Sequence, residues 1–137
     1  MDENIKLDLI NKIKKGLFEI EDFNNFIEFL AVICNESDEI KQELEDENLT
    51  IQLAIEHSIF AWIKVDSGNI SAGQGEIENS DVTIHMTENV CQKLFSGEID
   101  AVEAYKSGSL KIEGPIALAL KFKEIISMVK EFVTENY

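Results

Sequence analysis

Arginine is absent from this chain of 137 residues. All twelve basic residues are lysines, they are outnumbered by 27 acidic residues, and the formal net charge is −15. The planar guanidinium of arginine is the usual group for recognising phosphate and guanine. Its absence, together with the acidic balance, argues against binding to nucleic acid and against docking on anionic membranes.

Long apolar runs are also missing, since none approaches the roughly 20 residues that a membrane-spanning helix needs. The first ten residues, MDENIKLDLI, are acidic and mixed, unlike a signal peptide. Only two cysteines are present, Cys34 and Cys91, and both lie in apolar segments, which predicts buried reduced thiols and no disulfide. We therefore expect a cytoplasmic protein without stable membrane insertion.

Motifs of catalysis and of metal or cofactor binding are lacking as well. The sequence contains no HExxH, no GxGxxG before a helix, no P-loop and no GxSxG. Neither His57 nor His85 has a cysteine or carboxylate at metal-ligand spacing, and His85 is expected on a solvent-exposed face. The prediction is a protein that is not an enzyme, with no catalytic residues, no metal and no cofactor.

What is present is a change of apolar period near Asn48. Residues 1–47 carry apolar residues at intervals of three and four, and Ser37 is placed to cap a helix that follows it. From Asn48 the apolar residues alternate, which predicts four consecutive strands in an antiparallel meander with one buried face. These strands are expected at residues 50–56, 58–66, 69–76 and 80–86.

Helical patterns return after the fourth strand. Thr87 and Asp100 are good N-caps for two short helices, a fifth strand is expected at residues 109–113, and Pro115 favours the first turn of a long last helix. The fold class is α+β: a five-stranded, mostly antiparallel sheet with helices packed on one face. We expect a single domain, residues 1–137, with a helical part at 1–47 and the rest at 48–137. The inward sheet face should carry Leu53, Ile55, Ile63, Val65, Val82, Ile84, Leu110 and Ile112.

Two aromatic residues, Phe60 and Trp62, fall on the outward face of the second strand. Neighbouring aromatics on a solvent face suggest a cover. The cover is either a helix from the first third of the chain or another subunit, and we expect a contact between two copies, that is, a homodimer.

The segment SDVTIHMTENVCQKLFSGEIDAVEAYKSGSLKIEGPIALALKFKEI resembles the sterol carrier protein family, the non-specific lipid-transfer class with a sterol-binding domain. The shared pattern is a strand with aspartate, a helix ending Leu-x-x-Gly, a short helix with alanine, a strand between two glycines, and an apolar helix. The residues that match it are Asp81, Thr83, Leu94, Gly97, Ala104, Gly108, Leu110, Ile112, Gly114, Ala119 and Phe122. The resemblance covers roughly residues 49–129, and its C-terminal half is the more specific part.

The resemblance implies an apolar tunnel between the sheet and the helices that holds an acyl chain, an acyl-CoA, a sterol or another lipid such as an isoprenoid. The chain ends ENY and lacks the peroxisomal address of eukaryotic members, which predicts a cytoplasmic, single-domain member of the prokaryotic type. Two functions remain open. One is a lipid carrier without chemistry, and the other is a non-catalytic accessory or dimerisation module of the same fold that assists an enzyme.

The last helix has more apolar surface than one packing face requires. Its main stripe docks on the sheet, whereas Ile116 and Leu120 lie on the opposite side and need another partner. That partner is the N-terminal helices, a lipid tunnel or a second subunit. On the tunnel hypothesis, the lipid-binding residues are Ile84, Met86, Val90, Leu94, Val102, Tyr105, Ile116, Leu118, Leu120, Phe122 and Ile126. Its mouth is expected near the start of the last helix, with Lys121 and Lys123 as the cations for an anionic head group unless they are ordinary solvated lysines.

Overall fold

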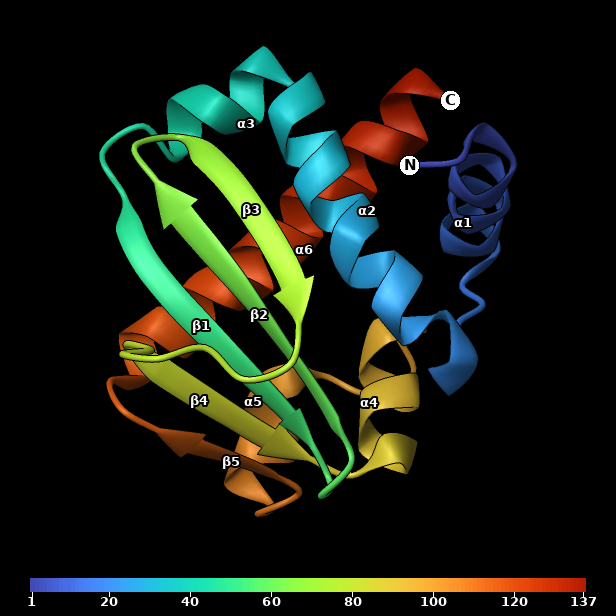
Figure 1. Ribbon diagram of the computed structural model, residues 1–137. Coiled ribbons are helices and arrows are strands. Elements are labelled where there is room, and N and C mark those ends of the chain that lie inside the picture. Colours follow the sequence, from blue (N-terminus) through green and yellow to red (C-terminus); the bar gives the residue numbers. More distant parts are fainter.

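The central sheet of the computed structural model, which describes residues 1–137, has the strand order β3-β2-β1-β4-β5 (Figure 1). The pairing of β1 with β4 is parallel, and the other three pairings are antiparallel. The strands are β1 (Asn48–Ile55), β2 (Ile59–Asp66), β3 (Asn69–Gln74), β4 (Val82–Met86) and β5 (Leu110–Glu113). The α+β class and the five mostly antiparallel strands are confirmed.

The predicted meander is wrong at the fourth strand, because β4 pairs with β1 and not with β3. The free edge of β3 is occupied by a helix: the Asn35 amide accepts from the backbone N–H of Ile70 at 3.1 Å and donates to its carbonyl at 2.7 Å. With that edge taken, the chain crosses the sheet after β3 and pairs at the free edge of β1 (Figure 1). The β3–β4 connection therefore sets the topology.

The helices form one layer behind the sheet and along the edge of β3 (Figure 1). They are α1 (Glu3–Lys15), the short 3₁₀ helix η1 (Ile20–Asp22), α2 (Phe23–Glu36), α3 (Asp38–Glu43), α4 (Glu88–Phe95), α5 (Ala101–Lys106) and α6 (Ile116–Asn136). The predicted N-caps are confirmed, since the side chains of Ser37, Thr87 and Asp100 accept from backbone N–H groups in the first turns of α3, α4 and α5. None of these helices combines the length and apolar character required to cross a bilayer.

The inner face of the sheet and the helices share a core of 31 buried residues. Ile51 lies opposite Ile63 and Val82, and Leu53 lies opposite Ile84, so the predicted strand faces are correct. Of the residues expected on this face, all are buried except Ile112, which is half-buried. The strand register therefore follows the alternation in the sequence.

Aromatic rings connect the first helices to this core. The Phe95 ring at the end of α4 lies 5.1 Å from the Phe26 ring, centroid to centroid, and 6.5 Å from the Phe122 ring of α6. Phe18 meets Phe95 edge-on at 5.1 Å. Such pairs contribute roughly 0.5–1.5 kcal/mol beyond the area they bury, so residues 1–47 are packed firmly against the rest.

The helices all lie on the other side of the sheet from Phe60 and Trp62, which are half-buried (Figure 1). This removes a helix of the first third of the chain, the alternative cover considered for these two aromatics. The Trp62 ring lies over Gly73 of β3, where an added Cβ would stand only 2.5 Å from the ring. Glycine at this position thus leaves room for the indole. A second subunit on this face stays a prediction.

The Gln52 side chain forms hydrogen bonds that hold the β3–β4 connection against the outer face of the sheet. Its side chain is 6 % exposed, donates to the Gly75 carbonyl at 3.1 Å and accepts from the Ile77 N–H at 2.7 Å. Replacement by methionine keeps the volume but leaves these backbone groups without their partner. Because an unsatisfied buried group costs about 1–3 kcal/mol, we expect Gln52→Met to lower the free energy of unfolding by about 2 kcal/mol.

Urea unfolding measures this loss, and Gln74→Met is the matched control. Gln74 ends β3 with an exposed side chain, so its replacement should change the free energy of unfolding by less than about 0.5 kcal/mol. Equal losses in the two variants would show that the Gln52 hydrogen bonds contribute nothing specific.

Candidate functional site

Helix α6 turns one face to the core and a second face, with apolar residues and two lysines, to the cavity. The first face is embedded in the core through Phe122, Ile125, Val129 and Val133. The second is formed by residues that recur at intervals of three and four, which places them in one row along the helix. They are Ile116, Ala119, Lys123, Ile126 and Lys130.

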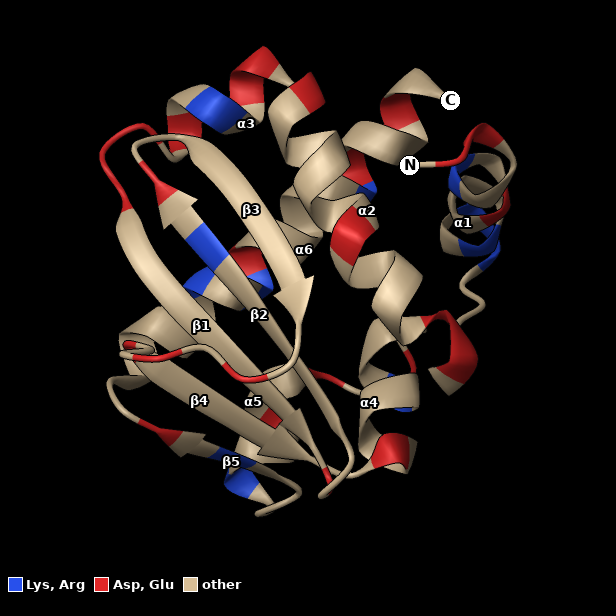
Figure 2. Ribbon diagram, viewed as in Figure 1, with Lys and Arg blue, Asp and Glu red and all other residues tan.

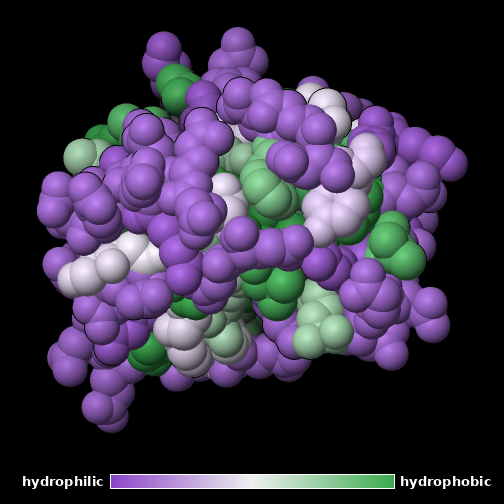
Figure 3. All heavy atoms as spheres, turned by 90° about the horizontal axis from the view of Figure 1, so that it is seen from above, coloured by the Kyte–Doolittle hydropathy of each residue, from purple (hydrophilic) through white to green (hydrophobic).

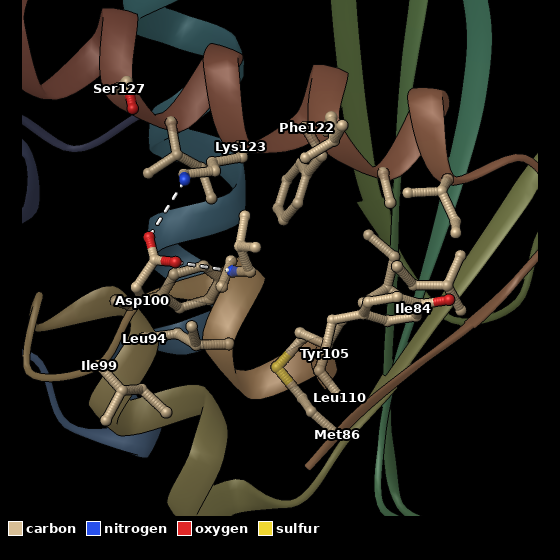
Figure 4. A pocket seen from close by; sticks show the side chains of 18 of the residues that line it. Ile84, Met86, Leu94, Ile99, Asp100, Tyr105, Leu110, Phe122, Lys123 and Ser127 are labelled. Carbon is tan, nitrogen blue, oxygen red and sulfur yellow. Dashed lines mark hydrogen bonds and ion pairs between the residues drawn. The ribbon is translucent and has the colours of Figure 1, made fainter. Parts of the chain in front are cut away.

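A cavity of about 430 Å³ lies between this row, the helices α4 and α5, and the strands β4 and β5 (Figure 4). Fifteen of the 20 residues that line it are hydrophobic. Figure 4 shows Phe122, Tyr105, Met86 and Leu110 gathered around the open space. The volume falls in the range of about 300–1,000 Å³ that small-molecule sites usually have, and the walls offer few polar groups.

The cavity brings together most of the side chains that the sequence assigned to it. Those that line it are Ile84, Met86, Leu94, Val102, Tyr105, Ile116, Leu120, Phe122, Ile126 and Lys123. Val90, Leu118 and Lys121 lie outside the lining, and Val90 and Leu118 pack against the core instead. Residues that the sequence analysis missed include Phe95, Ile99, Ala119 and Lys130.

The start of α6 forms an apolar rim. Ile116 and Leu120 are each 46 % exposed and Tyr105 is 39 % exposed, yet all three line the cavity. The N-terminal helices therefore do not bury Ile116 and Leu120, which removes the first of the three partners considered for them. Exposed apolar side chains continuous with a cavity are typical of an entrance for an apolar ligand.

The two lysines expected to meet a head group lie in different places. Lys123 is at the cavity, where its Nζ is 3.1 Å from Oδ1 of Asp100 (Figure 4). That hydrogen bond holds the pKa of Asp100 below its usual value, and backbone donors of α5 lower it further. Lys121 reaches Glu124 at 2.9 Å and Glu47 at 3.2 Å, and these carboxylates raise its pKa. Both ammonium groups already have carboxylate partners.

Two cavity lysines, Lys106 and Lys130, have no carboxylate partner; Lys106 is exposed, whereas Lys130 is half-buried. The Lys130 Nζ donates to the backbone carbonyl of Phe95 at 3.0 Å, and no acidic oxygen lies within 4.0 Å. Burial lowers the pKa of Lys130, because the charged form loses hydration in these apolar surroundings. The spacing of 116, 119, 123, 126 and 130 could have identified Lys130, which the sequence analysis did not consider.

Both cysteines, Cys34 and Cys91, are buried free thiols. Burial raises the pKa of the Cys34 and Cys91 thiols to about 12, so neither forms the thiolate that a nucleophile needs at neutral pH. No group of three or more histidine, cysteine or acidic side chains is arranged to hold a metal ion. The outward-facing His85 has its Nε2 3.4 Å from Oε2 of Glu113.

A second hollow, of about 720 Å³, lies between α3 and α6 and differs in chemistry. Glutamates supply five of its 14 lining residues. The part of the molecule that carries α3 is rich in acidic residues (Figure 2), and the view from that end is mainly hydrophilic, with apolar side chains inside a central hollow (Figure 3). Only five of the 14 residues that line the hollow between α3 and α6 are hydrophobic, which makes it a poor site for an apolar ligand. The smaller cavity beneath α6 is therefore the candidate site.

Comparison with known proteins finds a protein family and sequence relatives that match this chain. The model of the SCP-2 sterol transfer family matches residues 10–127. Human hydroxysteroid dehydrogenase-like protein 2 is 34% identical over 70 residues, which are 51% of this chain and 16% of that protein. This chain therefore spans about a sixth of the length of that relative.

Two solved structures share the fold. Sterol carrier protein 2 from Yarrowia lipolytica superposes with a TM-score of 0.65 at 14% identity, covering 79% of this chain and 89% of that one. The UbiJ-SCP2 ubiquinone synthesis protein superposes with a TM-score of 0.61 at 15% identity, covering 79% and 91%. At these identities the likeness concerns the fold.

Proposed function

Since the chain belongs to the SCP-2 sterol transfer family, we propose that it is a non-catalytic carrier that holds a lipid in the cavity beneath α6. The ligand classes are an acyl chain, an acyl-CoA, a sterol or an isoprenoid. The observation that carries the proposal is the cavity of about 430 Å³ with mainly hydrophobic walls and an exposed apolar rim. Nineteen of its 20 lining residues lie within residues 10–127, which the family model covers, and the exception is Lys130.

The energetics of burial favour a chain-like ligand. Each methylene removed from water contributes about 0.8 kcal/mol, so burying the roughly fifteen methylenes of a long chain supplies about 12 kcal/mol. Binding costs offset part of this gain, and an affinity in the micromolar range or better follows for a long chain. The rim residues Ile116, Leu120 and Tyr105 give such a chain an apolar path to the interior.

An accessory role is the second candidate. The likeness to the UbiJ-SCP2 ubiquinone synthesis protein, together with the match to one part of a much longer dehydrogenase-like protein, favours it. In this role the domain would assist an enzyme or dimerise without holding a lipid itself. The outer sheet face with Phe60 and Trp62 is the surface we propose for a contact between two copies.

Native mass spectrometry of the purified chain separates the two candidates. The carrier function predicts a monomer with a bound lipid that organic extraction removes and added fatty acid restores. A dimer that takes up no lipid would contradict the carrier function and favour the accessory module.

A further inference from the structure

Lys130 lies at the end of the cavity opposite the exposed rim. The row on α6 runs from Ile116 to Lys130, which is about 20 Å along the helix axis at a rise of 1.5 Å per residue. The Ile116 end faces β4, β5 and α5, whereas Lys130 lies against the end of α4, where it reaches the Phe95 carbonyl. The cavity thus has an apolar end and an end with an amine.

The environment of Lys130 is incomplete for an ammonium group. An ammonium has three N–H donors, and the Phe95 carbonyl uses one of them. The other charged residues that line the cavity are Asp100, Lys106 and Lys123, and the one carboxylate among them is engaged by Lys123 and by the backbone of α5. A half-buried cation beside apolar walls, with donors to spare, fits an anion that arrives with a ligand.

We propose that Lys130 binds the carboxylate of a free fatty acid whose chain lies along α6 with its tail toward Ile116. This inference rests on the proposed carrier function and specifies the ligand class of the same cavity. It replaces Lys121 and Lys123 as the head-group cations, because both are held by carboxylates of the protein.

The placement of the amine distinguishes among lipid classes. A carboxylate is small enough to be enclosed in the cavity beside α4. The bulky head of an acyl-CoA would have to stay outside the cavity, where the Lys130 ammonium cannot reach it. A fatty alcohol of the same length fills the same apolar walls but lacks the charge. The acid should therefore bind better than the alcohol, and Lys130 should account for the difference.

Competitive displacement of a neutral fluorescent probe, diphenylhexatriene, by hexadecanoic acid and by hexadecanol at pH 7 tests this assignment. We expect the affinity of the wild type for the acid to exceed its affinity for the alcohol by about tenfold or more. Lys130→Met should reduce the affinity for the acid about tenfold and leave the alcohol unchanged, and Lys130→Arg should keep the preference for the acid. Lys93→Met, at a half-buried lysine of α4 outside the cavity, is the control and should change neither affinity.

The outcomes separate this inference from the function on which it rests. If the Lys130→Met variant binds both ligands as the wild type does, or loses both equally, the role of Lys130 is wrong while the lipid carrier stands. If the wild type binds neither the probe nor either ligand, the carrier function and the role of Lys130 both fail.

Discussion

Ala119→Trp should lower the affinity for a long-chain lipid about a hundredfold without unfolding the protein. Ala119 is half-buried and lines the cavity at the middle of the row on α6, so an indole there projects into the open space. If it excludes four methylenes of the ligand, the loss is about 3 kcal/mol, which corresponds to roughly two orders of magnitude in the dissociation constant. Titration with a fluorescent fatty acid measures the change, and circular dichroism checks the fold.

The control for this variant is Ala117→Trp, two residues earlier on the same helix. Ala117 is exposed, lies outside the cavity, and is rotated by about 200° around the helix axis from Ala119. The indole there should stay in solvent and leave the affinity within about twofold of wild type. Equal losses in the two variants, or normal binding by Ala119→Trp, would place the ligand outside this cavity.

Gly114→Ala should lower the free energy of unfolding by about 3 kcal/mol and the melting temperature by about 10 °C. Gly114 joins β5 to α6 at a φ of +114°, a conformation that alanine adopts only with strain. A Cβ there would also stand 2.7 Å from the Asp81 carbonyl oxygen and 3.2 Å from Cα of Val82. Both obstacles are backbone atoms at the start of β4 or just before it, so relief requires moving β4 or the start of α6.

Gly108→Ala measures the cost of placing alanine at a positive φ without the steric clash that an alanine at position 114 would have. Gly108 also has a positive φ, +84°, but a Cβ there meets nothing within 4 Å. This variant should lose about 1 kcal/mol, and the difference between the two variants in thermal or urea unfolding measures the contact with β4. A loss at Gly114 no larger than the loss at Gly108 would show that the close approach has no energetic weight.

Local features of the fold could be predicted because they depend on neighbouring residues. The caps at Ser37, Thr87 and Asp100 form within one turn of the residues that they bond, and the alternation from Asn48 determines which side chains face the core. The parallel pairing of β1 with β4 could not be predicted in this way. It depends on Asn35 occupying the edge of β3 and on Gln52 holding the connection across the sheet, two contacts distant in sequence.

The candidate site shows the same division. Ile116 and Leu120 stood out in the sequence because they lie opposite the main apolar stripe of α6. The cavity itself, and with it the lining side chains of β4 and α5, was predicted only from the family resemblance. Val90 and Leu118 were misplaced because their helices turn them toward the core. The surroundings of the lysines could not be predicted at all, since Glu47 and Asp100 reach Lys121 and Lys123 from elements distant in sequence.

A spin-labelled lipid gives the most direct test of the proposed site. Stearic acid carrying a nitroxide on its chain broadens the backbone amide signals of nearby residues in a nitrogen–proton correlation spectrum of the protein. The account predicts broadening at Ile84, Leu110, Ala119 and Ile126, which line the cavity, and unchanged signals for Ser71 on β3 and for the Trp62 indole, on the outer face. Uniform broadening, broadening confined to the hollow between α3 and α6, or no change at any cavity residue would contradict a lipid site beneath α6.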